Sequence, residues 1–247
     1  MMKNPVQYCM CDAFPGRVTG QQPPAHSRAR AASGFFGLLA AFLIAVFSPP
    51  VASPAAEPAE TNAVVEKIQK AYQGISDLSG SFVQKNVIRE LKKTDTYKGA
   101  FFIKRPMKMK WAYTGKAAQD ITINNETVTL YRKGDPQAYR SKFDKAGFGQ
   151  TPVALLSGFG DIRKEFTISG RENSLVLTPK SQMSNIATIT LNVDTADEEA
   201  FPIRSFVIRD TRNNVVEIEL RDVKTNTGLK DSAFVPSLPK DVMVLEQ

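Results

Sequence analysis

The chain has 247 residues, of which 42% are hydrophobic and 23% charged, and its formal net charge is +7. This composition is typical of a globular protein and excludes a disordered or fibrous chain. Its one histidine, His26, and its two cysteines, Cys9 and Cys11, all precede an apolar run at residues 34–47. If that run is removed during export, catalytic triads, thiol nucleophiles and Cys/His zinc sites are nearly excluded.

The apolar run (GFFGLLAAFLIAVF) is 14 residues long, whereas a membrane-spanning helix needs about 20. Arg28 and Arg30 precede it, and a stretch of small residues and prolines follows. This arrangement predicts a leader at residues 1–56 that carries a secretory signal cleaved near residues 52–56. An uncleaved membrane anchor is the alternative. Residues 57–247 then form a single domain with a net charge of +4, too small an excess to indicate a nucleic-acid-binding protein.

The first element predicted after the leader is a helix at residues 61–72, where apolar residues recur on one helical face. Thr61 or Asn62 can cap its start, and Gly74 can end it. Most of the chain after this helix alternates apolar and polar residues with a period of two, which predicts antiparallel strands with one buried face. The alternation is clearest at residues 107–113, 121–123, 175–177, 189–193 and 216–220.

Turn signals separate these segments, and a short apolar helix is predicted at residues 151–157. The sequence therefore predicts about ten strands and two or three helices. A large, curved antiparallel sheet can form an incomplete barrel around a cavity, or a sandwich that is dry inside, and the pattern alone leaves both open. The turn signals are Asn-Asn at 124–125, Lys-Gly-Asp-Pro at 133–136, Ser-Gly at 169–170 and Arg-Asn-Asn at 212–214.

Arg105 shares its parity with the apolar residues at 101, 103, 107, 109 and 111. If the strand continues through Pro106, the guanidinium points toward the buried side, where it must be fully hydrogen-bonded. Backbone carbonyls at the end of a covering helix are suitable acceptors, because the planar guanidinium can donate to several at once. Alternatively, Pro106 marks a turn that directs Arg105 to solvent.

The residues after position 56 contain no phosphate-binding loop and no calcium-binding loop. Their acidic residues are scattered over predicted turns and outer strand faces. We therefore expect neither an enzyme nor a bound metal or cofactor. A hydrolase that uses only carboxylates is the remaining enzymatic alternative.

Five segments in order resemble the LolA family of periplasmic outer-membrane lipoprotein carriers, and the resemblance covers residues 61–247. No single motif is decisive, but their order and spacing agree with the family. The segments are SDLSGSFVQK at 76–85, GAFFIKRPMKMKW at 99–111, TPVALL at 151–156, LVLTPK at 175–180 and FVPSLPKDV at 234–242.

The resemblance implies a mainly β fold with a helical lid (α+β), in which an incomplete antiparallel β-barrel surrounds a hydrophobic cavity. It implies a periplasmic chaperone that takes acylated lipoproteins from an inner-membrane lipoprotein-releasing ABC transporter to an outer-membrane lipoprotein receptor. A carrier or sensor of another envelope lipid or lipoprotein on the same scaffold is the alternative. The expected state is a monomer that binds no nucleic acid.

Arg105 matches the arginine that latches the lid in this family, so the resemblance favours donation from Arg105 to carbonyls of the lid. Acyl chains are costly to expose to water, and the inward parity of the strands identifies the side chains that we expect to line the acyl cavity. These are Phe101, Ile103, Met107, Met109, Trp111, Ile121, Ile123 and Leu130.

Overall fold

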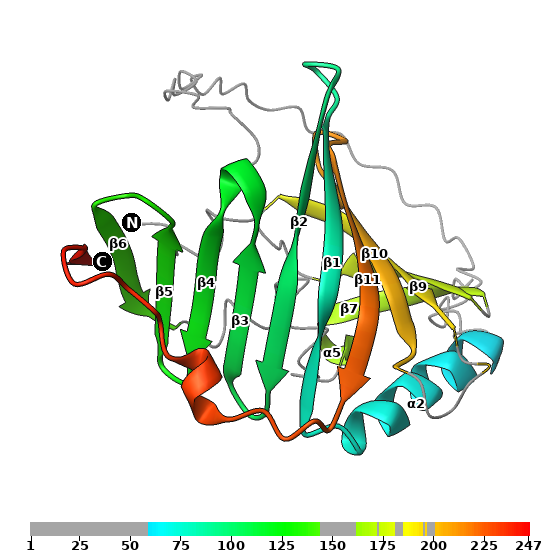
Figure 1. Cartoon of the computed structure of the whole chain (residues 1–247). Helices are drawn as coiled ribbons and strands as arrows, with labels where there is room; N and C mark the ends of the chain where they lie inside the picture. The colour runs from blue at the N-terminus through cyan, green and yellow to red at the C-terminus, as the bar shows by residue number, and fades with distance from the viewer. Residues whose placement is uncertain (1–58, 144–161, 172, 181–184, 195, 197–200) are drawn as a thin grey trace, which may run out of the picture. The chain divides into compact units, whose positions relative to one another are not determined.

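The protein is described by a computed structural model, which covers residues 59–143, 162–171, 173–180, 185–194, 196 and 201–247. The predicted leader at 1–56 and the predicted helix at 151–157 lie outside these residues. The described residues form twelve strands in one sheet, with α2 (Ala59–Gln73) and the short α5 (Ile162–Glu165) (Figure 1). The mainly β fold expected from the sequence is therefore confirmed.

The chain forms two meanders of consecutive strands. The last strand of the second meander pairs with the first strand of the first one. The strands are β1 (Asp77–Ile88), β2 (Lys93–Lys104), β3 (Lys108–Tyr113), β4 (Gln119–Asn124), β5 (Thr127–Arg132), β6 (Gln137–Lys142), β7 (Phe166–Arg171), β8 (Ser174–Pro179), β9 (Ile186–Val193), β10 (Ile203–Asp210), β11 (Val215–Thr225) and β12 (Met243–Glu246).

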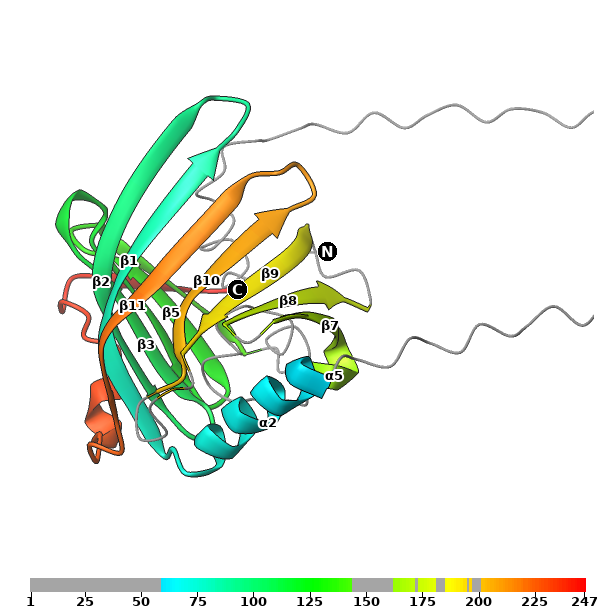
Figure 2. The same ribbon diagram turned by 90° about the vertical axis from the view of Figure 1, so that its right-hand side faces the viewer.

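The order across the sheet is β12-β6-β5-β4-β3-β2-β1-β11-β10-β9-β8-β7, and all pairs are antiparallel except β12 with β6. The two edge strands, β12 and β7, do not pair with each other, so the sheet is open. Figure 2 shows that it is also strongly curved. This is the incomplete barrel that the resemblance implied.

Helix α2 begins two residues before the predicted start and ends at Gln73. Its apolar face packs into the core through Val64, Val65, Ile68 and Tyr72, of which the most exposed is only 8% accessible. The Thr61 hydroxyl donates to the carbonyl oxygen of Gly170 in β7 at 2.9 Å. Helix α2 thus lies across one end of the curved sheet and is held there by packing and by this polar contact (Figure 2).

Three of the four predicted turns lie between strands, and the fourth prediction is wrong. Ser169 and Gly170 belong to β7, which continues to Arg171 before the hairpin to β8. Gly170 has a φ of +142°, and a Cβ there would lie 2.2 Å from the carbonyl oxygen of Ser174. Glycine at this position therefore allows the two strands to approach closely, and it does not mark a reversal of the chain.

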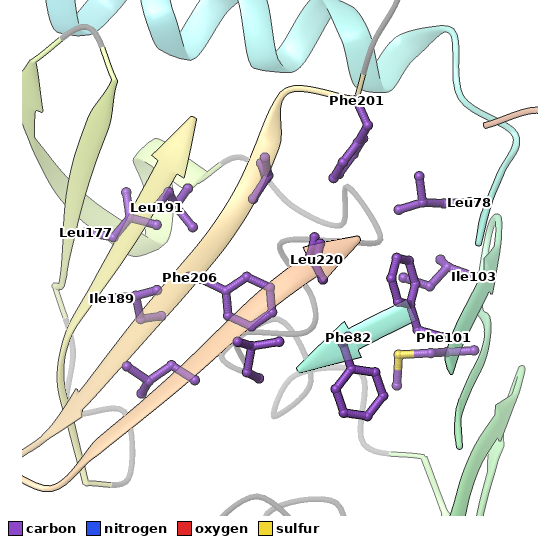
Figure 3. Close-up of a cluster of buried hydrophobic side chains, with 14 of the residues drawn as sticks. Leu78, Phe82, Phe101, Ile103, Leu177, Ile189, Leu191, Phe201, Phe206 and Leu220 are labelled. Atoms are coloured by element: carbon purple, nitrogen blue, oxygen red, sulfur yellow. The ribbon is translucent and has the colours of Figure 1, made fainter. Parts of the chain in front are cut away.

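The buried apolar side chains form one cluster that extends along the inner face of the sheet and under α2 (Figure 3). Successive strands contribute alternate residues to this face, as the period of two predicted. Among the described residues, no helix is both long and apolar enough to cross a membrane.

Candidate functional site

The predicted cavity residues lie together on the inner face of β2–β5. Cross-strand pairing places them in two rows, because residues opposite one another in adjacent strands share a face. One row is Ile103, Met109 and Ile123, and the other is Phe101, Trp111, Ile121 and Leu130.

Six of the eight predicted residues are buried to 6% accessibility or less, whereas Leu130 and Met107 are half-buried against the same cluster. Met107 was predicted to lie in a strand, but it precedes the first residue of β3 and lies in the turn after β2. The structure thus brings all eight side chains to one apolar region.

Trp111, the only tryptophan of the chain, is at the centre of an aromatic group. Its ring stacks on Phe82 with centroids 4.3 Å apart and on Phe101 with centroids 5.5 Å apart. Phe82 belongs to β1 and was not among the predicted residues, although it shares parity with Leu78 in the same strand, which gave a usable signal.

Glycines in β1 and β2 make room for these rings. A Cβ at Gly80 would lie 2.9 Å from the Phe101 ring, and one at Gly99 would lie 2.6 Å from the Phe82 ring. The rings therefore lie directly over the backbone of the neighbouring strand. The result is a compact stack of aromatic rings.

The apolar face becomes polar farther along β1, away from α2. The Tyr113 hydroxyl donates to Gln84 Oε1 at 2.9 Å, and Gln84 Nε2 donates to Asn86 Oδ1 at 2.8 Å. All three residues are buried. Because buried polar groups of this kind favour their own hydrogen bonds over apolar contacts, they mark the end of the continuous apolar surface.

Arg105 connects the sheet to the end of α2. Its Nη1 donates to the carbonyl oxygens of Tyr72, at 2.8 Å, and Ile75, at 3.3 Å. Its own backbone N–H donates to the Ser76 carbonyl oxygen at 3.0 Å. Carbonyls at the end of a helix lack partners within the helix and carry partial negative charge, which suits a guanidinium.

The expected donation from Arg105 to helix-end carbonyls is present, but the strand geometry from which it was argued is wrong. β2 ends at Lys104 and β3 begins at Lys108, so Arg105 and Pro106 form a turn. Arg105 is exposed and not buried. The turn carries the guanidinium beyond the end of the sheet, where it reaches α2 from the solvent side.

A second set of contacts, which no sequence pattern predicted, holds the segment that joins α2 to β1. The buried Asp77 carboxylate accepts hydrogen bonds from the backbone N–H groups of Thr227, Gly228 and Leu229, at 2.8, 2.9 and 3.3 Å, and from the Thr227 hydroxyl at 2.9 Å. Burial alone would raise the pKa of Asp77, but these hydrogen bonds outweigh it and hold the pKa below its usual value.

Asn226 contacts the same segment. We call residues 226–229, with their hydrogen bonds to residues 74–77, the 226–229 clamp. Asn226 Oδ1 accepts from the Ser76 backbone N–H at 2.8 Å, and its Nδ2 donates to the Gly74 carbonyl oxygen at 2.9 Å. The acceptors of Arg105 and the residues held by the 226–229 clamp are therefore neighbours in the chain. The two contacts hold the same junction from different elements.

The chain after the 226–229 clamp is anchored by Asp231, whose carboxylate accepts from Lys104 Nζ at 2.7 Å and Lys108 Nζ at 2.6 Å. Hydrogen bonds from these two lysines lower the pKa of Asp231 to about 2. The 3-10 helix η2 (Asp231–Phe234) follows, with Phe234 fully buried. The two lysines flank Arg105, so the turn that contacts α2 is itself fixed on both sides.

In the part of the chain that the structure describes, no group of three or more His, Cys, Asp or Glu side chains is placed to hold a metal ion. What the described residues do offer is a large apolar face, a helix over one end of it, and a small polar contact that connects the two.

The family model described as outer membrane lipoprotein carrier protein LolA matches residues 73–237. The chain belongs to the LolA family. An outer-membrane lipoprotein carrier protein of Cupriavidus pinatubonensis is 28% identical over 198 residues, which is 77% of this chain and 91% of the relative. The protein of the same name from Neisseria meningitidis serogroup B is 30% identical over 186 residues, covering 73% of this chain and 86% of the relative.

Among solved structures, a LolA superfamily protein of Nitrosomonas europaea overlaps with a TM-score of 0.42 at 12% identity, covering 72% of this chain and 98% of that one. An uncharacterized protein of Thermus thermophilus overlaps with a TM-score of 0.49 at 13% identity, covering 75% and 98% of the two chains. The family assignment therefore rests on the sequence matches.

Proposed function

We propose that this LolA family member is a periplasmic chaperone that binds the acyl chains of lipoproteins from the inner membrane and delivers them to the outer membrane. The observation that carries the proposal is the continuous apolar inner face of the sheet, with α2 packed over one end and tied to the β2–β3 turn by Arg105. Relatives named outer-membrane lipoprotein carrier proteins, aligned over most of their length, support it.

The physical basis is the cost of moving acyl chains through water. That cost is about 0.8 kcal/mol for each exposed CH₂ group, so a lipoprotein cannot cross an aqueous compartment without a partner that covers its chains. A carrier must also release its cargo. Its apolar surface should therefore be covered by its own side chains when it is empty, because an open face of this size would bind indiscriminately.

The closed arrangement of this protein fits that requirement. Six of the eight residues predicted to line the site are nearly inaccessible, and they pack on one another and on the buried core that includes α2. Acyl chains would reach them once α2 moves away from the sheet. We propose that Arg105 sets the free energy of that step, since its contact to the end of α2 must break when α2 shifts.

The remaining parts of the proposal follow from this role. The leader directs the chain to the periplasm, an inner-membrane ABC transporter supplies the lipoprotein, and an outer-membrane receptor accepts it. Binding and release need no bond to be made or broken, so we propose a protein without catalytic activity. The eight predicted side chains, from Phe101 to Leu130, supply the acyl contacts.

The test is release of lipoprotein from spheroplasts that are making it. Purified protein should yield a soluble one-to-one complex with an acylated lipoprotein, and a lipoprotein whose lipidated cysteine is replaced by serine should form no complex. If the soluble protein instead carries a phospholipid or glycolipid, which native mass spectrometry would detect, the scaffold serves a different envelope lipid. If no acylated molecule binds, the carrier proposal is wrong.

The apolar contacts have their own test. Met109→Glu and Trp111→Glu place a carboxylate on the inner face, where desolvation disfavours acyl binding. Lys98→Glu is the matched control, because Lys98 is exposed on the other face of the neighbouring strand β2. We expect lost lipoprotein capture for the first two variants and normal capture for the control. Equal capture by all three would exclude this surface as the acyl site.

A further inference from the structure

Two hairpin turns project from the sheet at the end away from α2 (Figures 1 and 2). One joins β1 to β2 at residues 89–92, and the other joins β10 to β11 at residues 211–214. β1 starts beside α2 and has 12 residues, so at about 3.3 Å per residue its far end lies roughly 40 Å from the start. The turns are thus well separated from Arg105 and the apolar face under α2.

One hydrogen bond joins the two turns. The Arg89 backbone N–H donates to Asn214 Oδ1 at 3.0 Å, and Asn214 is only 5% exposed. Within the second turn, Asp210 Oδ1 accepts from the backbone N–H groups of Arg212 and Asn214, at 2.8 and 2.7 Å. The surface that the turns present is therefore preorganised.

This surface, which we call the tip surface, is basic. It consists of the exposed side chains of Arg89, Glu90, Leu91, Lys92, Lys93, Arg209 and Arg212.

The nearby acidic residues do not balance these cations. Asp95 pairs with Lys93 at 2.8 Å, and the Asp210 carboxylate is occupied by its own turn. Of the basic residues of the tip surface, only Lys93 takes part in a salt bridge found within the described residues. The five basic side chains of the tip surface therefore outnumber the three carboxylates around them, those of Glu90, Asp95 and Asp210, and leave a net charge of +2.

Leu91 is the apolar residue of the tip surface, among its charged side chains. Its side chain is 57% exposed, and only two other large apolar residues in the described part of the chain, Val235 and Met243, are as exposed. The first turn thus exposes an apolar side chain that follows Glu90 and precedes Lys92 in the sequence. A solvated turn of this length has no structural need for leucine, since polar residues and glycine fit turns at least as well.

We propose that the tip surface docks the protein on anionic lipid headgroups of a membrane. Arginine and lysine side chains bind the headgroup phosphates, and Leu91 enters the interface between headgroups and acyl chains. A bilayer fits this surface better than an acidic protein does. A projecting leucine needs a shaped pocket on a protein, whereas a fluid interface accepts it in any orientation.

The expected binding is weak and sensitive to salt. Each basic residue near an anionic surface strengthens binding by about fivefold, and screening acts over about 10 Å at 0.1 M salt. Such an interaction would bring the protein to a membrane without holding it there, as a shuttling protein requires.

Co-sedimentation of the purified protein with vesicles tests the proposal. Vesicles of phosphatidylglycerol and phosphatidylethanolamine should bind the protein at low salt, and neutral phosphatidylcholine vesicles should not. Lys92→Glu should weaken binding at least fivefold, since it reverses a charge, and Leu91→Ser should weaken it severalfold. Val235→Ser and Lys230→Glu are matched controls with exposed side chains on another part of the chain, and they should bind normally.

A Met109→Glu variant separates this proposal from the carrier proposal, because it alters the inner face and leaves the tip surface intact. It should bind vesicles normally while losing lipoprotein capture. Failure to bind anionic vesicles overturns the docking proposal, as does an equal loss in the control variants. Binding lost in Met109→Glu but kept in Lys92→Glu would also overturn it, because the lipid would then enter the apolar site.

Discussion

Replacing Arg105 with leucine should loosen α2 without unfolding the sheet. The substitution removes the Nη1 donor to the carbonyl oxygens of Tyr72 and Ile75, at 2.8 and 3.3 Å. A hydrogen bond from a charged donor contributes about 1.5–3 kcal/mol when buried. Arg105 is exposed, one bond is long, and water can replace both. The net loss is therefore about 1–2 kcal/mol, which makes opening of α2 about 5- to 30-fold more frequent.

Native-state hydrogen exchange measures this change directly, because amides protected by α2 exchange only when the helix opens. We expect α2 amides to exchange about 5- to 30-fold faster in Arg105→Leu, with little change for amides of β9 and β10. Arg221→Leu is the matched control, since Arg221 is an exposed arginine paired with Glu219 on the outer face of β11. Unchanged α2 exchange, or an equal acceleration throughout the protein, would refute the role given to Arg105.

Gly99→Ala should lower the melting temperature sharply, because its Cβ would lie 2.1 Å from the Ala112 carbonyl oxygen. Gly74→Ala should be tolerated, since the nearest atom to its Cβ would lie at 3.8 Å. Equal melting temperatures for the two variants would contradict the packing. Asp77→Asn should reduce the free energy of unfolding by about 2–3 kcal/mol in urea titrations at pH 7. The low folded-state pKa of Asp77 means that the carboxylate stabilises the fold above its unfolded pKa of about 3.8 and loses that effect as pH falls through the folded value. The difference in stability between wild type and variant should therefore shrink as the pH falls below 3.8, and a constant difference would argue against the charge. NMR titration of the Asp231 carboxyl should give a pKa near 2, and an ordinary value would show that its lysine contacts do not persist in solution.

The sheet could be predicted from the sequence because the alternation of apolar and polar residues within a strand shows which of its faces is buried. Met109 and Trp111 alternate with Lys110, and the structure buries the first two on the inner face. The period of two is local, so a single chain reveals it. The number of strands was harder to predict, since short strands such as β12 have too few residues to show the alternation.

Arg105 shows where local patterns mislead. Its parity with the apolar residues of β2 and β3 indicated a buried position, yet the chain turns at Pro106 and the side chain is exposed. The hydrogen bonds to the end of α2 are nevertheless present. The family resemblance also favoured them, and it does not depend on parity. Gly170 misled in the opposite direction, since close strand packing and chain reversal both favour glycine.

The 226–229 clamp could not be predicted from the sequence. Asp77 and its partners are about 150 residues apart. In the sequence, a lone aspartate and a Thr-Asn-Thr-Gly turn each resemble an ordinary solvated surface. Only the pairing of β1 with β11 brings them together. Contacts between distant segments depend on the whole topology, so a local pattern in either segment carries no trace of them.

The central claim, that acyl chains bind on the inner face of the sheet, is tested most directly by site-specific photocrosslinking in living cells. A photoreactive amino acid at Met109 faces inward, and one at the adjacent Lys110 faces outward. The account predicts that position 109 crosslinks to acylated lipoproteins and that position 110 does not. Crosslinks to lipoproteins from position 110 alone, or equally from both, would contradict it.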